Sequence, residues 1–336
     1  MSELNKIALK ILSNGKGILA ADESNGTMTK RLNSVNVPST PENRLLFRET
    51  LFSSNGMKDF IGGVILYDET INQTSSSKKT IPELISLSGA VPGIKVDTGA
   101  KILAGSTGEK ITEGLDGLRE RLEAYYKLGA RFTKWRGVYS ISDRFPSKLS
   151  IRSNAHALAR YSALVQECGM VPIVEPEVLM DGDHSAEVCL NKTSEVIKRC
   201  FEELAIHKID LGGIILKPNM ILAGTSSNKK ISSEEVAKLT LKCLKENVPF
   251  EVPGIAFLSG GQTEIEATEN LNLINKYNDT GFIMTYSYGR ALQKSALKFW
   301  SKDIKNASGT QKVFNHRANM CTLAAQGIWS AELEKK

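Results

Sequence analysis

Eight short apolar segments recur along the chain, and each ends at a polar or charged residue. A loop and a helical stretch follow each segment, at a spacing that fits repeated strand–loop–helix units. The segments are nearly continuous in apolar residues, which is typical of parallel strands that are buried on both faces. The predicted strands are 17–22, 61–69, 92–97, 131–136, 171–177, 213–219, 254–261 and 281–289.

Amphipathic helices are predicted between these strands. Leu118, Leu122 and Tyr125 recur at helical spacing, and Gly129 follows them as a residue that often ends a helix. Another helix begins at "TEIE", where Thr263 has a glutamate three residues later. This pattern is typical of a capping box, in which the two side chains bond backbone N–H groups that the helix leaves free.

Eight alternating strands and helices predict a single (β/α)₈ barrel, the TIM-barrel fold of the α/β class. Two doubly wound domains are the alternative, but no G-x-G-x-x-G motif follows the first strand to support them. Apolar residues at helical spacing predict an extra helix before the barrel and another after it. We expect one domain over 1–336, with an amino-terminal helix in 1–16, the barrel in 17–300 and a carboxy-terminal helix with a short tail in 301–336.

The composition is that of an ordinary globular protein, with 41% hydrophobic and 24% charged residues. The net charge of +6 is a mild excess of scattered basic residues, which fits a small anionic substrate and argues against nucleic acid as a partner. The sequence shows neither a secretory signal nor an apolar run of membrane-spanning length. Its five cysteines are an odd number without C-x-x-C spacing, so we expect a cytoplasmic protein with reduced thiols.

Side chains that could take part in chemistry stand at seven of the eight predicted strand ends. In a barrel of this kind the active site lies at the carboxyl ends of the strands. One such residue alone is more often a helix cap or a solvated charge, but capping does not explain so many together. Residues two apart on a strand face the same way, so we expect these side chains to point inward together. The residues are Asp22, Lys95, Lys134, Arg136, Glu175, Glu177, Lys217, Ser259, Ser287 and Arg290.

Lys217 ends an apolar strand in "GIILKPN", a place where a charged side chain is seldom found. Desolvation and the nearby cation of Lys134 both favour its neutral amine, which attacks carbonyl carbons to form a Schiff base. Glu175 is a candidate for the general acid and base that dehydrates the carbinolamine. Cations and carboxylates that converge in one pocket predict a doubly anionic substrate.

Two glycine-containing loops near the end of the chain predict phosphate binding. "LSGGQTE" and "YSYGRALQ" each precede a predicted helix, and backbone N–H groups at helix starts bind phosphate. The loops after the seventh and eighth strands are the usual phosphate site of such barrels. Either loop alone could be a glycine-permitted turn. The candidate residues are Ser259, Gly260, Gly261, Ser287, Gly289 and Arg290.

Metal chemistry is not expected from the sequence. The four histidines, at positions 156, 184, 207 and 316, are dispersed and include no pair at the spacing of metal ligands. Neither a Walker motif nor a Ser-His-Asp signature is present.

The strand-end motifs together resemble those of the class I, Schiff-base-forming fructose-bisphosphate aldolases. The resemblance covers essentially the whole chain, and "VEPEVLMDGDH" and "FLSGGQ" are its most specific parts. Thr98 in "KVDTG" and Asp68 in "YDET" favour a prokaryote-like branch of the family. The other motifs are "GILAADES", "GVILYDET", "PGIKVDTG", "GLDGLRERL", "KWRGV", "LKPNM" and "SYGRALQ".

The resemblance implies reversible cleavage of fructose 1,6-bisphosphate to dihydroxyacetone phosphate and glyceraldehyde 3-phosphate, in glycolysis and gluconeogenesis. Lys217 would form the Schiff base, and Glu175 would be the acid and base of carbinolamine dehydration, with Lys134 beside it. Glu177 would orient the nucleophile, and Asp22 would take the proton of the C4 hydroxyl. No metal or other cofactor is implied, and the family implies a homotetramer.

The resemblance also divides the two phosphate sites. Ser259, Gly260, Gly289 and Arg290 would hold the 1-phosphate. The other phosphate would lie on basic residues of earlier strands and loops, namely Lys30, Arg31, Lys95 and Arg136.

One departure from the family concerns proton transfer to the enamine. Animal members use a tyrosine at the end of a long tail for this step, but this chain contains no tyrosine after Tyr288. Glu175 and water are the candidates for the proton donor. A related aldolase that prefers another phosphorylated ketose, such as sedoheptulose 1,7-bisphosphate, is an alternative. A non-catalytic scaffold barrel is disfavoured because the full set of reactive residues is present.

Overall fold

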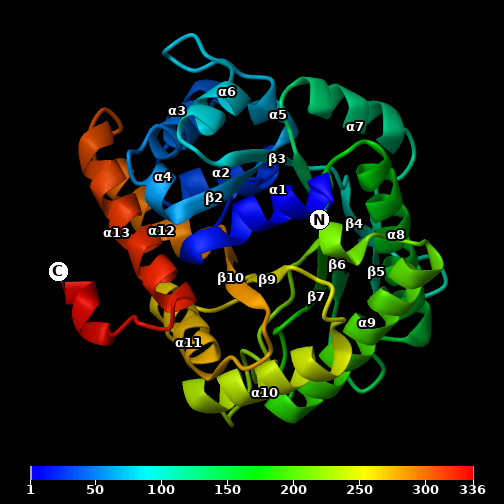
Figure 1. The fold of residues 1–336 in the computed structure, drawn as a ribbon. Helices are drawn as coiled ribbons and strands as arrows, with labels where there is room; N and C mark the ends of the chain where they lie inside the picture. Colours follow the sequence, from blue (N-terminus) through cyan, green and yellow to red (C-terminus); the bar gives the residue numbers. More distant parts are fainter. Residues whose placement is uncertain (1, 336) are drawn as a thin grey trace.

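The computed structural model describes residues 2–335, and its centre is a closed barrel of eight parallel strands. Neighbours around the barrel follow the order β1-β10-β9-β8-β7-β6-β3-β2. The helices form a ring around it (Figure 1). The barrel strands are β1 (Gly17–Ala20), β2 (Ile61–Leu66), β3 (Val91–Lys95), β6 (Phe132–Tyr139), β7 (Val171–Val178), β8 (Ile215–Leu216), β9 (Gly254–Phe257) and β10 (Ile283–Tyr288).

All eight predicted strands are present, and the (β/α)₈ fold class is confirmed. β8 is the most shortened, because the prediction ran over 213–219 and only two residues pair. Gly213 belongs to a 3₁₀ turn (Leu211–Gly213), and Pro218 has no N–H to donate to a neighbouring strand. The backbone N–H of Lys217 still donates to the carbonyl oxygen of Val174, at 2.8 Å, so the lysine is fixed to the barrel.

The helices begin and end near the predicted positions. The capping box of Thr263 and Glu266 is present at the start of α11. The helices of the ring are α2 (Asn25–Asn33), α3 (Pro41–Phe52), α4 (Met57–Phe60), α5 (Asp68–Ile71), α6 (Ile81–Leu87), α7 (Leu118–Lys127), α8 (Lys148–Glu167), α9 (Ala186–Ile206), α10 (Ser233–Asn247), α11 (Glu264–Tyr277), α12 (Arg290–Trp300) and α13 (Ala307–Ala325).

A small antiparallel hairpin, β4 (Gly99–Ile102) and β5 (Lys110–Glu113), was not predicted. Most of its side chains are exposed, so the hairpin has no apolar face that a hydrophobic pattern could reveal. It packs beside β6, where the hydroxyl of Thr112 donates to the carbonyl oxygen of Arg136 at 2.6 Å. The hairpin, which lies between β3 and α7 in the sequence, therefore packs beside β6 without joining the closed sheet.

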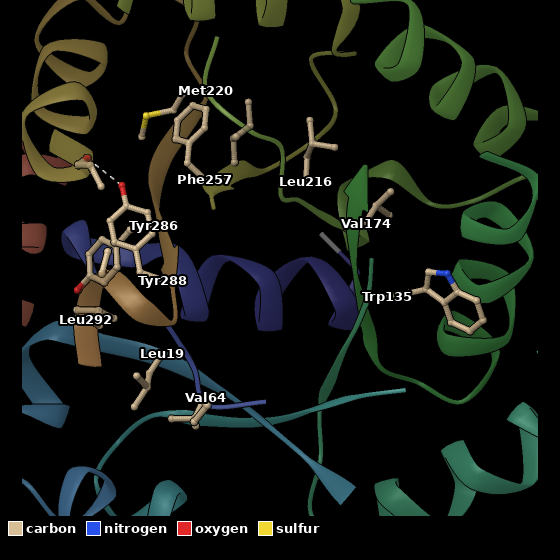
Figure 2. Close-up of a cluster of buried hydrophobic side chains, with 14 of the residues drawn as sticks. Leu19, Val64, Trp135, Val174, Leu216, Met220, Phe257, Tyr286, Tyr288 and Leu292 are labelled. Carbon is tan, nitrogen blue, oxygen red and sulfur yellow. Dashed lines mark hydrogen bonds between the residues drawn. The ribbon is translucent and has the colours of Figure 1, made fainter. Parts of the chain in front are cut away.

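Apolar side chains outside the barrel join the strands to the ring of helices. Figure 2 shows Leu19, Val64 and Val174 among the side chains of this layer, with Trp135 directed towards the green helices. Tyr286 lies in the same layer, and its hydroxyl donates to the carbonyl oxygen of Phe60 at 2.7 Å. In the described part of the chain all five cysteines are free, as expected, and no helix is both long and apolar enough to cross a membrane.

The predicted amino-terminal helix, α1 (Glu3–Leu12), lies across one end of the barrel (Figure 1). Its residues Ala8, Ile11 and Leu12 are buried in the same cluster as Phe132 and Val171, the first residues of β6 and β7. The helix thus closes the end where the strands begin. Their carboxyl ends, where the polar residues lie, are left open on the opposite side.

The contact between α1 and β2 depends on a residue without a side chain. A methyl group added to Gly62 would lie 1.8 Å from the carbonyl oxygen of Ile11, which is far inside van der Waals contact. We therefore expect G62A to displace α1 and to lower the free energy of unfolding in urea by about 1–3 kcal/mol or more. In the matched control G137A, the new methyl group meets ordinary contacts at 3.5 Å, so little loss is expected. Equal stability of the two variants would contradict this packing.

Candidate active site

A cavity of about 530 Å³ lies at the carboxyl ends of the strands, on the side of the barrel away from α1. All but two of the predicted site residues line it. The lining residues from the prediction are Asp22, Arg31, Lys95, Lys134, Arg136, Glu175, Glu177, Lys217, Ser259, Gly260, Ser287, Gly289 and Arg290.

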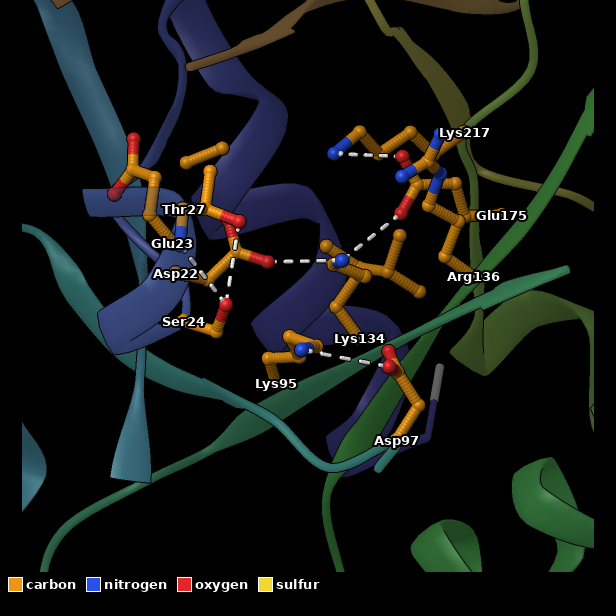
Figure 3. A network of polar contacts seen from close by, with 12 residues as sticks. Asp22, Glu23, Ser24, Thr27, Lys95, Asp97, Lys134, Arg136, Glu175 and Lys217 are labelled. Carbon is orange, nitrogen blue, oxygen red and sulfur yellow. Dashed lines mark hydrogen bonds and ion pairs between the residues drawn. The ribbon is translucent and has the colours of Figure 1, made fainter. Parts of the chain in front are cut away.

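The buried centre of the cavity is a chain of alternating charges. The Nζ atom of Lys217 lies 3.1 Å from Oε1 of Glu175, and Oε2 of the same carboxylate lies 3.3 Å from Nζ of Lys134. Lys134 in turn lies 2.8 Å from Oδ2 of Asp22. Figure 3 shows Lys134 between the two carboxylates, with Lys217 on the far side of Glu175. Four charged groups from β6, β7 and the ends of β8 and β1 therefore form one connected network.

The strand register explains why these side chains meet. Arg136 of β6 is paired with Glu175 of β7, and Lys134 lies two residues before Arg136 on the same face. Glu177 is likewise two residues after Glu175, and it forms an ion pair with Arg136. The alternation expected from the sequence therefore places both pairs inside the barrel.

Mutual attraction keeps Asp22, Lys134 and Glu175 ionised despite their burial. Burial alone lowers the pKa of Lys134, but the nearby carboxylates of Asp22 and Glu175 outweigh it, so the pKa is raised. Burial likewise raises the pKa of each carboxylate, but the cations of Lys134 and Lys217 reverse the effect and lower both values. Asp22 and Glu175 are therefore anions in the resting protein, the form that accepts a proton.

Glu177 differs from the other two carboxylates. Its burial raises its pKa, and the nearby charge of Glu175 adds to the increase, while the ion pair with Arg136 only partly opposes it. Glu177 thus holds a proton more readily than Glu175, although the two residues are neighbours on one strand.

The glycine-containing loops after β9 and β10 meet at the rim. The guanidinium of Arg290 donates to the carbonyl oxygen of Gly260 at 2.8 Å, which joins the two loops. Ser287 is buried, and in the described part of the chain its hydroxyl has no hydrogen-bond partner. A buried donor without a partner is a favourable position for an anionic ligand.

A second group of cations lies across the barrel from these loops. β3 and β6 are opposite β9 and β10 in the strand order, and Lys95 ends β3. The Nζ atom of Lys95 lies 3.5 Å from Asp97, and Arg136 ends the inward row of β6. The two positive ends with the charged network between them suit a chain-like molecule that has an anionic group at each end.

Two residues of the predicted set do not line the cavity. Lys30 is exposed on α2, and Gly261 is exposed beside the sulfur of Met180. Their assigned contacts with phosphate stay predictions. Both positions came from motifs rather than from strand direction, and a motif does not fix which way a side chain or an N–H group points.

The sequence reasoning missed several residues at the cavity. Glu23 is buried there and accepts hydrogen bonds from Arg31, Arg48 and Gln293, which fixes the carboxylate beside the rim. Position 23 directly follows Asp22, and no pattern in the sequence separated its role from that of a helix cap. Asp97, Ser24, Thr27, Gly99 and Ala100 also line the cavity.

Comparisons with known proteins agree on one family. A model of the fructose-bisphosphate aldolase class-I family matches residues 3–336. A Xylella fastidiosa protein named probable fructose-bisphosphate aldolase class 1 is 47% identical, over 98% of this chain and 99% of that protein. Fructose-bisphosphate aldolase 4, cytosolic, of Arabidopsis thaliana is 46% identical, over 99% of this chain and 85% of that protein.

A solved structure agrees with the fold. It is that of fructose-bisphosphate aldolase from Plasmodium falciparum, in complex with TRAP and a small-molecule inhibitor. It superposes with a TM-score of 0.96 at 43% identity, and the match covers 98% of this chain and 95% of that one.

The low pKa of Asp22 predicts a pH dependence of stability. A carboxylate with a lowered pKa in the folded state stabilises the protein above its unfolded value of 3.8, and this contribution disappears as the pH falls through the folded value. We expect D22N to be less stable than the wild type at pH 7 by roughly 3 kcal/mol, because Lys134 loses a buried partner.

Below pH 4 the free energies of unfolding of D22N and the wild type should begin to approach each other, because the Asp22 carboxyl group binds a proton there in the unfolded state but not in the folded state. Urea unfolding at pH values from 7 to 3 measures both curves, and D116N, which changes an exposed aspartate, is the control that should follow the wild type. Parallel curves for D22N and the wild type would show that Asp22 has no lowered pKa.

Proposed function

The chain belongs to the class-I fructose-bisphosphate aldolase family, and we propose that the cavity at its strand ends is the active site, with Lys217 as the Schiff-base lysine. The enzyme cleaves fructose 1,6-bisphosphate reversibly to dihydroxyacetone phosphate and glyceraldehyde 3-phosphate, a step of glycolysis and gluconeogenesis. Class-I aldolases use a lysine Schiff base and no metal ion. The observation that supports the assignment is the buried Lys217–Glu175–Lys134–Asp22 network.

In the proposed first step, Oε1 of Glu175, 3.1 Å from Nζ of Lys217, accepts a proton from the ammonium, and the neutral amine that results attacks the C2 ketone of the substrate. One proton of the attacking nitrogen then moves to the C2 oxygen, which gives the carbinolamine. The same carboxyl group then protonates the C2 hydroxyl, which leaves as water while the iminium forms. Lys134 holds the other oxygen of Glu175, so Oε1 stays directed at the reacting nitrogen.

In the proposed second step, Asp22 accepts the proton of the C4 hydroxyl. The C3–C4 bond breaks, its electron pair moves into the iminium to give an enamine, and glyceraldehyde 3-phosphate leaves. The lowered pKa of Asp22 keeps this side chain ionised and able to accept the proton. The cationic iminium supplies the driving force that compensates for the weak basicity of the carboxylate.

In the proposed third step, the enamine is protonated at C3. We assign this step to Glu175, since the enamine carbon C3 is two bonds from the nitrogen that this carboxyl group faces. The proton that Asp22 accepted reaches Glu175 through Lys134, which contacts both carboxylates. Water then hydrolyses the resulting iminium and releases dihydroxyacetone phosphate, which restores the amine of Lys217. Glu177, with its raised pKa and its ion pair to Arg136, orients the groups around the reacting carbon.

The two ends of the cavity are assigned to the two phosphates. Ser259, Gly260, Gly289 and Arg290 take the 1-phosphate, which the unpartnered hydroxyl of Ser287 supports. The 6-phosphate lies on the other side of the barrel, on Lys95, Arg136, Arg31 and Lys30. Of these, Lys30 must turn in from its exposed position.

We also propose a cytosolic location, which the name of the Arabidopsis thaliana relative supports. A homotetramer is proposed on family membership alone. The division into an amino-terminal helix, a barrel and a carboxy-terminal helix with a tail is proposed to form one functional domain over 1–336.

Trapping of the covalent intermediate tests the role of Lys217. Incubation with dihydroxyacetone phosphate and reduction with borohydride should leave one adduct per chain, which peptide mass spectrometry should locate on Lys217. K217M should give no adduct and no detectable cleavage of fructose 1,6-bisphosphate. K229M, which replaces an exposed lysine, is the control and should leave both the adduct and the cleavage rate unchanged. An adduct on Lys134 instead would contradict the proposal.

Hydrogen exchange tests the role of Glu175. With dihydroxyacetone phosphate alone in deuterated water, NMR follows the exchange of the C3 proton, and trapping follows formation of the Schiff base. E175Q should slow cleavage by about 10²–10⁴-fold, the range for loss of a general acid and base. Exchange should slow more than Schiff-base formation does. If exchange per trapped Schiff base stays at the wild-type rate, water or another group is the donor.

A further inference from the structure

Three potential metal ligands meet on the outside of the barrel, away from the cavity. His156 lies on α8, Glu203 lies near the end of α9, and His207 directly follows α9. One ligand atom from each residue lies within 4.8 Å of the other two. The proposed cleavage mechanism uses none of the three. The sequence spacing did not reveal them, because His156 joins the other two only through the packing of α8 against α9.

The distances are close to those of a coordination shell. Oε2 of Glu203 lies 3.3 Å from Nδ1 of His156 and 3.9 Å from Nδ1 of His207. Zinc binds nitrogen and oxygen at about 2.0–2.2 Å in tetrahedral geometry, so neighbouring ligand atoms are separated by about 3.3–3.6 Å. The distance from Oε2 to His156 already fits this range. A small rotation of the His207 ring would bring its Nδ1 atom equally close to Oε2.

The carboxylate is held in a suitable orientation. Arg199 forms an ion pair with Oε1 of Glu203, and Glu203 is buried, so Oε2 is directed towards the two imidazole rings. A partner that fixes the second oxygen of a ligand carboxylate is a usual feature of metal sites. Nδ1 of His207 also lies 2.9 Å from the carbonyl oxygen of Glu203, a hydrogen bond that the ring gives up when Nδ1 binds an ion.

The cluster opens into a cavity of about 600 Å³. Both histidines line it, together with Arg119, Arg160, Glu120 and Glu167, whose charges balance. Three protein ligands beside an open cavity leave a coordination position for water or a small solute, as in zinc sites that are not fully enclosed. Imidazole with carboxylate suits Zn²⁺ and neighbouring transition metals better than Mg²⁺ or Ca²⁺.

We propose that His156, Glu203 and His207 bind one divalent transition-metal ion, represented by Zn²⁺. The ion takes the place of the hydrogen bond between His156 and Glu203, and it links α8 to the end of α9. These helices follow β6 and β7, which contain Lys134 and Glu175, but the ion takes no part in the aldol reaction. The proposal is therefore independent of the proposed catalytic roles.

Calorimetric titration of the metal-free full-length protein with Zn²⁺ tests the site. We expect one ion per chain, and H156Q should weaken binding at least tenfold, since even loss of an outer partner of a metal ligand costs about 10–100-fold. His156 is the better position to change, because its side chain is about half exposed, whereas His207 also holds the helix end. The controls are H316Q, which removes a histidine on α13, and C168S, which removes the partly exposed thiol.

Unchanged affinity in H156Q, or loss of binding in C168S or H316Q, would overturn the assignment. X-ray absorption at the zinc edge of the wild type gives an answer that needs no variant. Two imidazole ligands and oxygen should surround the ion, and a sulfur ligand or a single imidazole would contradict the site. Zn²⁺ should also raise the unfolding temperature of the wild type but not that of H156Q.

Discussion

The structure depends on the ammonium group of Lys134, which is buried between two carboxylates. It forms ion pairs with both Asp22 and Glu175, and Glu175 is also paired with Lys217. Removing the charge of Lys134 would leave Asp22 without a partner, and removing that of Glu175 would leave Lys217 without one, which is strongly destabilising. The two inner groups, Lys134 and Glu175, therefore stabilise the two outer ones. The order of charges also fixes which oxygen of Glu175 faces Lys217, so the same constraint sets the geometry of proton transfer.

The barrel makes this arrangement possible because it separates packing from chemistry. Apolar side chains of α1 and of the first strand residues fill the end of the barrel where the strands begin. The polar residues stand at the opposite, carboxyl ends of the strands. Burial of the network is unfavourable by itself, and the extensive apolar contacts around the strands stabilise the fold that contains it. A closed sheet also has no free edge that could shift register, so Arg136 remains opposite Glu175.

The sequence predicts those parts of the structure that follow from local periodicity and strand direction. Apolar runs revealed all eight barrel strands, and the period of two correctly placed Lys134 with Arg136 and Glu175 with Glu177 inside the cavity. It did not predict the β4–β5 hairpin, whose exposed side chains have no apolar face. Glu23 was missed for a different reason, since its partners Arg48 and Gln293 approach from helices that only the tertiary fold brings near.

The two charged clusters of the molecule show why some sites can be read from a sequence and others cannot. The residues of the cavity share one structural rule, since each lies at the end of a parallel strand, and a barrel gathers all such ends in one place. His156, Glu203 and His207 share no such rule. Their meeting depends on how far along each other α8 and α9 pack, and one helical turn of displacement would move His156 about 5 Å away. A search by sequence spacing therefore detects the first cluster, whereas the second requires the packed helices.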